Sequence, residues 1–138
     1  MNSSAGYSGT PLWKKLGYAD GLRAFLIDAP AGYVSLLRLP PEIKVAWQAR
    51  APAGVRFVHL FATEASVLRR HLTRLRTGIA PEGVIWVSWP KKASGVATDI
   101  TEDTIRSIAL PTGLVDIKVC AVDDTWSGLK LMIRKSER

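Results

Sequence analysis

The chain has 138 residues, 47% of them hydrophobic and 22% charged, a balance typical of a globular protein and not of a disordered one. This length predicts one domain with one core, and no apolar run reaches the roughly 20 residues that cross a bilayer. Nineteen basic and 12 acidic side chains give a net charge of +7, which favours encounters with polyanions. The cations are scattered, however, so we expect neither nucleic acid nor a membrane as the partner.

The N-terminus and the single cysteine indicate the compartment. Residues 1–9 are small and polar, without the charged and apolar regions of a secretory signal, and we expect them to be flexible. Cys120 cannot form an internal disulfide and is interpreted as a small core residue. We therefore expect a cytoplasmic protein whose residues 10–138 form a single α/β domain.

The predicted elements alternate between helix and strand before a terminal hairpin. Thr10 as cap and Pro11 at the first helical position begin a helix that Gly17 ends. In chain order, the expected elements are helix 10–16, strand 22–27, helix 33–39 (with Val34, Leu36 and Leu37 at helical spacing), strand 43–47, strand 55–62, helix 64–76, strand 84–89, helix 102–110, strand 115–122 and strand 129–134.

This order predicts an α/β fold with three layers, Rossmann-like, with a mostly parallel sheet and a C-terminal antiparallel hairpin. The nearly continuous apolar run of strand 55–62 is typical of a buried parallel strand. Trp86 and Trp89, three apart on one strand, should point to opposite faces. We expect at least one tryptophan to be partly exposed, and the weak strand 43–47 at a sheet edge predicts a homodimer.

Helix 64–76 is strongly amphipathic. Its apolar stripe consists of Val67, Leu68, Leu72 and Leu75. The opposite side carries Arg69, Arg70, Arg74 and Arg76. We interpret these arginines as the solvent face of the helix, and electrostatic nucleic-acid binding is the alternative.

The loop after strand 84–89 is the predicted ligand site, because ligands of open α/β sheets bind beyond the carboxyl ends of the strands. Two cations, a hydroxyl and a glycine amide suit a small anion, and an aromatic ring on the terminal hairpin could stack a planar ligand. The predicted ligand-binding residues are Trp89, Lys91, Lys92, Ser94, Gly95 and Trp126. In the alternative interpretation, Trp89 and Pro90 form a hydrophobic plug and both lysines are solvated.

The remaining polar residues indicate structure rather than chemistry. The run from Thr98 to Asp103 is explained by helix capping, and Asp123-Asp124 by a hairpin turn. His59, within an apolar strand, is interpreted as a hydrogen-bonded core residue, and His71 receives no role. Without a metal-ligand set or a nucleophile elbow, we predict no catalytic residue, no metal and no cofactor.

The element order resembles the carboxyl-terminal part of a class I methyltransferase sheet. Residues 79–87 are similar to the stretch of those enzymes in which lysine, proline and two glycines precede an apolar strand. Three longer motifs resemble a family of small bacterial proteins called domain of unknown function 3052: residues 7–12, 86–99 and 125–130. That resemblance implies a fold and no activity.

The chain departs from a working methyltransferase at both cofactor anchors. Loop 28–32 holds one glycine and a proline where the resemblance implies a glycine-rich turn. Residues 47–50 offer no carboxylate for ribose hydroxyls, and about one strand-helix unit is missing. We expect a non-catalytic module that binds a small anionic ligand or a partner protein at the C-terminal edge of the sheet. The alternative is an enzyme derived from the S-adenosylmethionine-dependent methyltransferase fold.

Overall fold

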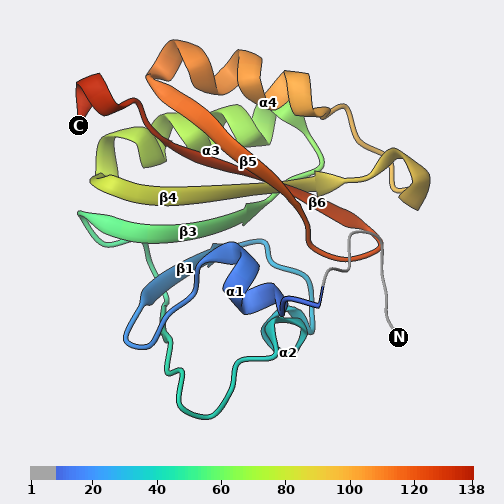
Figure 1. Ribbon diagram of the computed structural model, residues 1–138. Helices are drawn as coiled ribbons and strands as arrows, with labels where there is room; N and C mark the ends of the chain where they lie inside the picture. The colour runs from blue at the N-terminus through green and yellow to red at the C-terminus, as the bar shows by residue number, and fades with distance from the viewer. Residues whose placement is uncertain (1–8) are drawn as a thin grey trace.

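The structure, a computed structural model, describes residues 9–138, so the expected flexibility of residues 1–8 lies outside the described part. Helices and strands alternate and end in a hairpin (Figure 1). The elements are α1 (Leu12–Leu16), β1 (Arg23–Ile27), α2 (Tyr33–Leu37), β2 (Ala46–Gln48), β3 (Val55–Phe61), α3 (Ala65–Gly78), β4 (Ile79–Pro90), α4 (Glu102–Ala109), β5 (Leu114–Ala121) and β6 (Trp126–Ile133), with 3₁₀ turns at Lys92–Ser94, Leu110–Thr112 and Lys135–Glu137.

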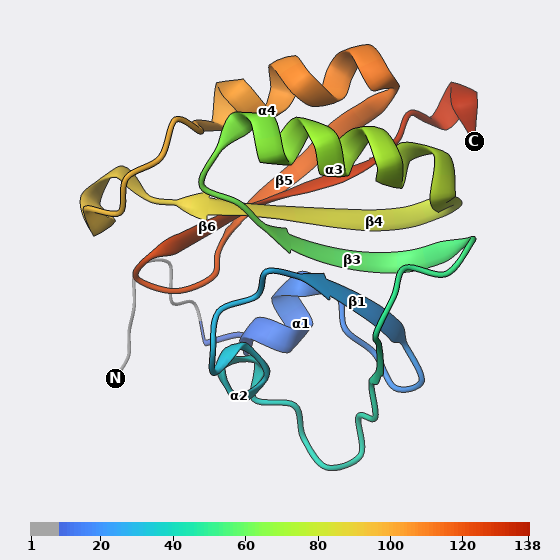
Figure 2. The ribbon, with the colours of Figure 1, turned by 180° about the vertical axis from the view of Figure 1, so that it is seen from behind.

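The six strands form one sheet in the order β2-β1-β3-β4-β6-β5. Strands β1 to β4 are parallel, and β6 runs antiparallel to both β4 and β5. Helices α3 and α4 cover one face, while α1 and α2 lie against the other (Figure 2). The predicted α/β fold with three layers, a mostly parallel sheet and a terminal hairpin is confirmed.

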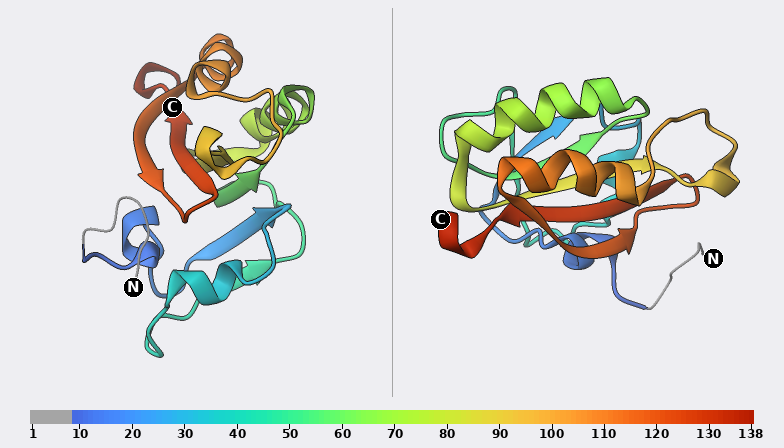
Figure 3. Two further views of the ribbon diagram at one scale, coloured as in Figure 1. Left: turned by 90° about the vertical axis from the view of Figure 1, so that its right-hand side faces the viewer. Right: turned by 90° about the horizontal axis from the view of Figure 1, so that it is seen from above.

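Each face of the sheet has its own hydrophobic cluster. Leu68 and Leu72 of α3 pack with Ile105 of α4 over one face, and Figure 3 shows these two helices side by side above the strands. Trp86 packs with α1 and α2 on the other face, whereas Trp89 belongs to the α3 side. The predicted opposite orientation of the two tryptophans is confirmed.

Several predicted boundaries shift. Helix α1 begins at Leu12 with Pro11 as its N-cap, so Thr10 does not cap it. Helix α2 ends at Leu37, because Arg38 adopts a left-handed conformation with φ of 56°. Its buried residues are Tyr33 and Leu37, whereas Val34 and Leu36, which share the predicted helical spacing, are exposed.

Strand β4 is longer than predicted, because residues 79–83 join it through an irregularity. Val55 pairs with Ile79 and Phe57 already pairs with Val84, so the intervening residues of β4 bulge out of the ladder. Gly83 lies at this bulge, where a Cβ atom would come within 2.4 Å of the Ile79 side chain. Close packing at the bulge therefore requires glycine.

The edge strand β2 carries the exposed tryptophan. Trp47 is 37% exposed, which confirms the expectation that one tryptophan is partly accessible, and its ring centroid lies 5.6 Å from that of Tyr18. Because β2 has only three residues, it offers a short edge for pairing. The homodimer stays a prediction.

Candidate functional site

The predicted anion loop follows the carboxyl end of β4 and is tied to the terminal hairpin. Pro90 pairs with Trp126, and the Lys91 amide donates to the Thr125 carbonyl oxygen at 2.7 Å. Lys91 and Trp126 therefore lie at one corner of the sheet. Trp89 is only 8% exposed and packs in the α3-side core, whereas Trp126 packs on the opposite face of the sheet.

Two donors of this loop are engaged within the loop itself. The Ser94 hydroxyl donates to the Lys91 carbonyl oxygen at 2.7 Å and accepts from the Val96 amide at 3.1 Å. The Gly95 amide donates to the Lys92 carbonyl oxygen at 3.3 Å, with φ of 79° at the glycine. These bonds close the turn, and a bound anion would compete with them for the donors.

Lys91 is the unusual residue of the loop. Its Nζ atom is buried and has no hydrogen-bond partner among residues 9–138, while Lys92 is exposed. A buried ammonium without a partner loses hydration and regains nothing. A bound anion would therefore stabilise Lys91 more than the solvated Lys92.

Replacing Lys91 by methionine is therefore expected to raise the free energy of unfolding by about 1–2 kcal/mol, because the apolar stem is largely kept and the buried charge removed. Urea denaturation followed by circular dichroism measures the change. Lys92→Met, at the exposed neighbour, is the control and should stay within about 0.5 kcal/mol of the wild type. If phosphate stabilises the wild type but not Lys91→Met, the loop binds anions. If Lys91→Met is instead less stable than the wild type, the Lys91 charge is compensated in the folded protein, which contradicts this interpretation.

The acidic run before α4 serves as helix caps. Thr101 and Thr104 form a capping box at the start of α4. Asp99 accepts from the Ala65 amide at 2.7 Å and so caps α3 across 34 positions of sequence, and the Thr98 hydroxyl donates to the Thr63 carbonyl oxygen. The capping interpretation is confirmed, with Asp99 serving a different helix from the one it precedes.

The acidic groups of α4, β5 and the hairpin turn that are described next are likewise engaged in structure. Arg106 pairs with Glu102 and Asp103 of its own helix and with Asp116 of β5. Asp123 accepts from the amides of Thr125 and Trp126, which confirms the predicted turn chemistry. No group of three or more His, Cys, Asp or Glu side chains in the described part of the chain could hold a metal ion.

The ring of Trp126 packs against the sheet. It lies edge-on to Phe61, with ring centroids 5.1 Å apart, and is half-buried in the α1/α2-side cluster. This contact leaves only part of the ring for stacking with a ligand.

His59 belongs to a buried polar chain that no sequence pattern indicated. Its Nδ1 lies 2.6 Å from the Tyr33 hydroxyl and its Nε2 lies 2.7 Å from the Ser88 hydroxyl, and the Tyr33 and Tyr18 hydroxyls are 2.7 Å apart. His59 is fully buried, and burial lowers its pKa to about 3, while burial raises the pKa of both tyrosines. The interpretation of His59 as a hydrogen-bonded core residue is confirmed.

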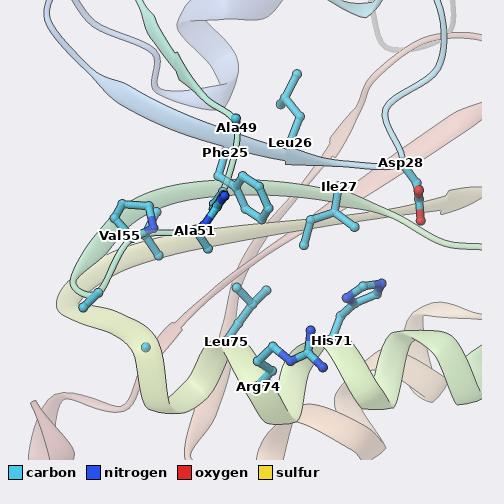
Figure 4. A pocket seen from close by; sticks show the side chains of 14 residues that line it. Phe25, Leu26, Ile27, Asp28, Ala49, Ala51, Val55, His71, Arg74 and Leu75 are labelled. Carbon is cyan, nitrogen blue, oxygen red and sulfur yellow. The ribbon is translucent and has the colours of Figure 1, made fainter.

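A cavity of about 610 Å³ lies between β1 and α3, away from the predicted loop (Figure 4). Phe25 and Ile27 of β1 point toward α3, whose Leu75, Arg74 and His71 point back toward the strand. The connection from β2 to β3 closes one side with residues 49–53. The volume falls within the range of small-molecule sites.

The cavity exists because the crossover from β2 to β3 contains no helix. Residues 49–54 join the two parallel strands on either side of β1, where such crossovers usually carry a helix that covers the middle strand. Phe25 and Ile27 consequently remain only partly buried. The signal available in the sequence was the shortness of this connection.

The charges around the cavity are mostly positive. Arg50 and Arg74 are exposed, and Asp28 at the end of β1 is the one acidic lining residue. Burial lowers the pKa of His71, and the nearby charges of Arg70 and Arg74 lower it further, although Asp28 opposes them. The site thus joins an apolar floor to a cationic rim.

The solved structures similar to this chain include several methyltransferases. The S-adenosylmethionine-dependent methyltransferase from Aquifex aeolicus has a TM-score of 0.63 at 13% identity, with 87% of this chain and 86% of that chain covered. A type 11 methyltransferase from Sulfolobus solfataricus, itself described only as a candidate, gives 0.59 at 11%, with 92% of each chain covered.

An O-methyltransferase from neocarzinostatin biosynthesis, solved with S-adenosylmethionine and a naphthoic acid, gives a TM-score of 0.64 at 14% identity and covers 94% of this chain but 51% of its own. No protein-family model matches the sequence, and no curated protein does. No helix in residues 9–138 is long and apolar enough to cross a membrane. At these identities the likeness concerns the fold, which is that of the class I methyltransferases.

Proposed function

We propose that this chain is a binding domain on a methyltransferase fold, which holds a small, partly apolar anion in the cavity between β1 and α3 and does not transfer methyl groups. The observation that carries the proposal is the cavity itself, with Phe25 and Ile27 at its floor and Arg50, Arg74 and His71 around it. It adjoins the point where the strand order reverses, since β2 lies on one side of β1 and β3 on the other. Residues that follow the carboxyl ends of β1 and β2 (Asp28, Ala49 and Arg50) line part of the cavity, and open α/β sheets bind ligands beyond the carboxyl ends of their strands at such points.

The residues at the two cofactor anchors do not fit S-adenosylmethionine. The turn after β1 contains Pro30, which has no amide donor, and its glycine, Gly32, with φ of 83°, is the N-cap of α2. The buried Tyr33 follows directly, and α2 has five residues, too few for an anion site at its N-terminus. At the end of β2, Arg50 stands near the position where a ribose would require a carboxylate.

An enzyme derived from this fold is the second candidate, favoured by the methyltransferase neighbours. The resemblance to the domain of unknown function 3052 family stays a prediction and adds no activity. Anion binding at Lys91, docking of a partner protein and a cytoplasmic location also stay predictions.

A thermal-shift panel at low salt tests the proposal, with phosphate, sulfate, fatty and aromatic carboxylates, nucleotides, S-adenosylmethionine and S-adenosylhomocysteine. A ligand present at one hundred times its dissociation constant stabilises the folded protein by about 2.7 kcal/mol, enough for a clear shift. We expect amphipathic anions to shift the melting temperature more than phosphate or sulfate, because only they also fill the apolar floor.

Ala51→Trp places a large ring at an exposed alanine of the cavity wall, and it is expected to weaken binding at least tenfold by occupying the space. Ala93→Trp, at an exposed alanine outside the cavity, is the matched control and should bind as the wild type does. Equal loss in both variants, or no loss in either, would place the ligand elsewhere. A shift with S-adenosylmethionine, followed by methyl transfer, would favour the second candidate.

A further inference from the structure

Three arginines on α3 form no ion pair with any residue of the described range 9–138. They are Arg69, Arg70 and Arg74, and all three are exposed. Arg76, predicted to share this face, instead donates to the Thr112 carbonyl oxygen and pairs with Glu137. Its inclusion in the arginine face was wrong, because Arg76 ties α3 to the end of the chain.

These three arginines adjoin the cavity. Together with Ser66 and Thr73 they line a shallow hollow on the outer side of α3, whose lining contains no carboxylate. Arg74 lines both this hollow and the cavity. A ligand bound to the apolar floor can therefore extend out of the cavity past Arg74 and along the arginine face (Arg69, Arg70 and Arg74).

The charge distribution favours several anionic groups over one. From Arg69 to Arg74 the helix rises about 7.5 Å, at 1.5 Å per residue, so the three guanidinium groups are within reach of one short chain of anions. Guanidinium groups bind phosphate oxygens through paired hydrogen bonds. Burial is the main reason that the pKa of His71 in the cavity wall is lowered; Arg70 and Arg74 lower this pKa further, and Asp28 opposes them.

We propose that the ligand of this cavity is a nucleoside di- or triphosphate or a compound of the same build, with its planar group on the floor formed by Phe25 and Ile27 and its phosphate chain along Arg74 and Arg70. This inference rests on the proposed function, since it assigns the ligand class of the same cavity. The cavity accounts for the apolar group, and the arginine face accounts for more than one phosphate. A single carboxylate or phosphate would leave Arg69 and Arg70 unused.

Isothermal titration calorimetry with adenosine and its mono-, di- and triphosphates tests this assignment. We expect the affinity of the full-length protein to rise at least tenfold from the monophosphate to the triphosphate. In the double variant Arg69→Gln, Arg70→Gln this gain should disappear, while the monophosphate binds as before. The control, Arg38→Gln with Lys44→Gln, removes the same charge at exposed residues outside both hollows and should keep the gain.

Other outcomes separate this inference from the proposed function. If the mono- and triphosphate bound with equal affinity and Ala51→Trp abolished binding of both, the arginine face would not bind the phosphate chain. The cavity would remain the binding site. Binding of non-phosphorylated amphipathic anions and of no nucleotide would also overturn the nucleotide assignment and leave the cavity as the binding site. The nucleotide assignment would also be overturned if the protein bound oligonucleotides with an affinity that increased with their length and was unchanged in Ala51→Trp. The arginine face would then be a nucleic-acid surface. Binding of no compound from either panel would contradict both proposals.

Discussion

Lowering the pH from 6.5 to 4.5 is expected to remove about 2–3 kcal/mol from the free energy of unfolding through His59 alone. Its pKa is about 3 in the folded protein and 6.5 without the fold. Between these values the unfolded chain binds a proton that the folded protein does not, so stability falls as the pH decreases. The physical cause is complete burial beside two hydroxyl groups, with no carboxylate to stabilise an imidazolium.

Urea denaturation of the wild type and His59→Gln at several pH values between 7 and 4.5 measures this effect. Glutamine keeps one hydrogen-bond donor and one acceptor but does not titrate. We expect the variant to be less stable at pH 7 and to lose less stability on acidification. Asp116, whose pKa Arg106 lowers, contributes equally to both proteins and cancels in the comparison. If the free energies of unfolding of the two proteins fell equally with pH, His59 would be protonated in the folded protein, which would contradict its lowered pKa.

Trp86→Ala is expected to destabilise the protein by about 3–5 kcal/mol, the usual cost of removing a buried tryptophan ring. Trp86 is fully buried in the cluster that joins the sheet to α1 and α2, and its Nε1–H donates to the Leu16 carbonyl oxygen at 2.8 Å. The substitution removes both the packing and the side-chain bond from Trp86 to the end of α1.

Trp86→Phe separates the two contributions. It keeps a ring but leaves the Leu16 carbonyl without its donor, and we expect a smaller loss of about 1–3 kcal/mol. Trp47→Ala, at the exposed tryptophan of β2, is the control and should cost under about 1 kcal/mol. Circular dichroism in urea measures all three variants. A loss for Trp86→Ala no greater than that for Trp47→Ala would contradict the tethering of α1 by this strand.

The sequence predicted those parts of the fold whose sequence pattern lies within a single helix or strand. The apolar run of β3, the stripe of α3 and the cap at Thr101 are each contained within one element, and each prediction is confirmed. Helix α2 shows where this approach fails, because several apolar residues in a short helix allow more than one buried side. Packing of Tyr33 against His59 selects the observed side.

The candidate site was harder to predict because it depends on which polar groups remain available. The sequence correctly placed the Lys91 loop at the carboxyl end of a strand. It could not show that Ser94 is already hydrogen-bonded or that Lys91 is buried without a partner. Both facts depend on side-chain positions that composition does not encode.

The sequence by itself determined the order of helices and strands, the parallel character of the sheet, the terminal hairpin and the cap of α4 at Thr101. Such features follow from periodicity and turn chemistry over a few residues. Only the tertiary structure decided that Asp99 caps α3, that four distant side chains form the His59 chain, and that a cavity opens beside β1. Each of these requires segments far apart in the sequence to meet, and their meeting is determined by the packing of the whole domain.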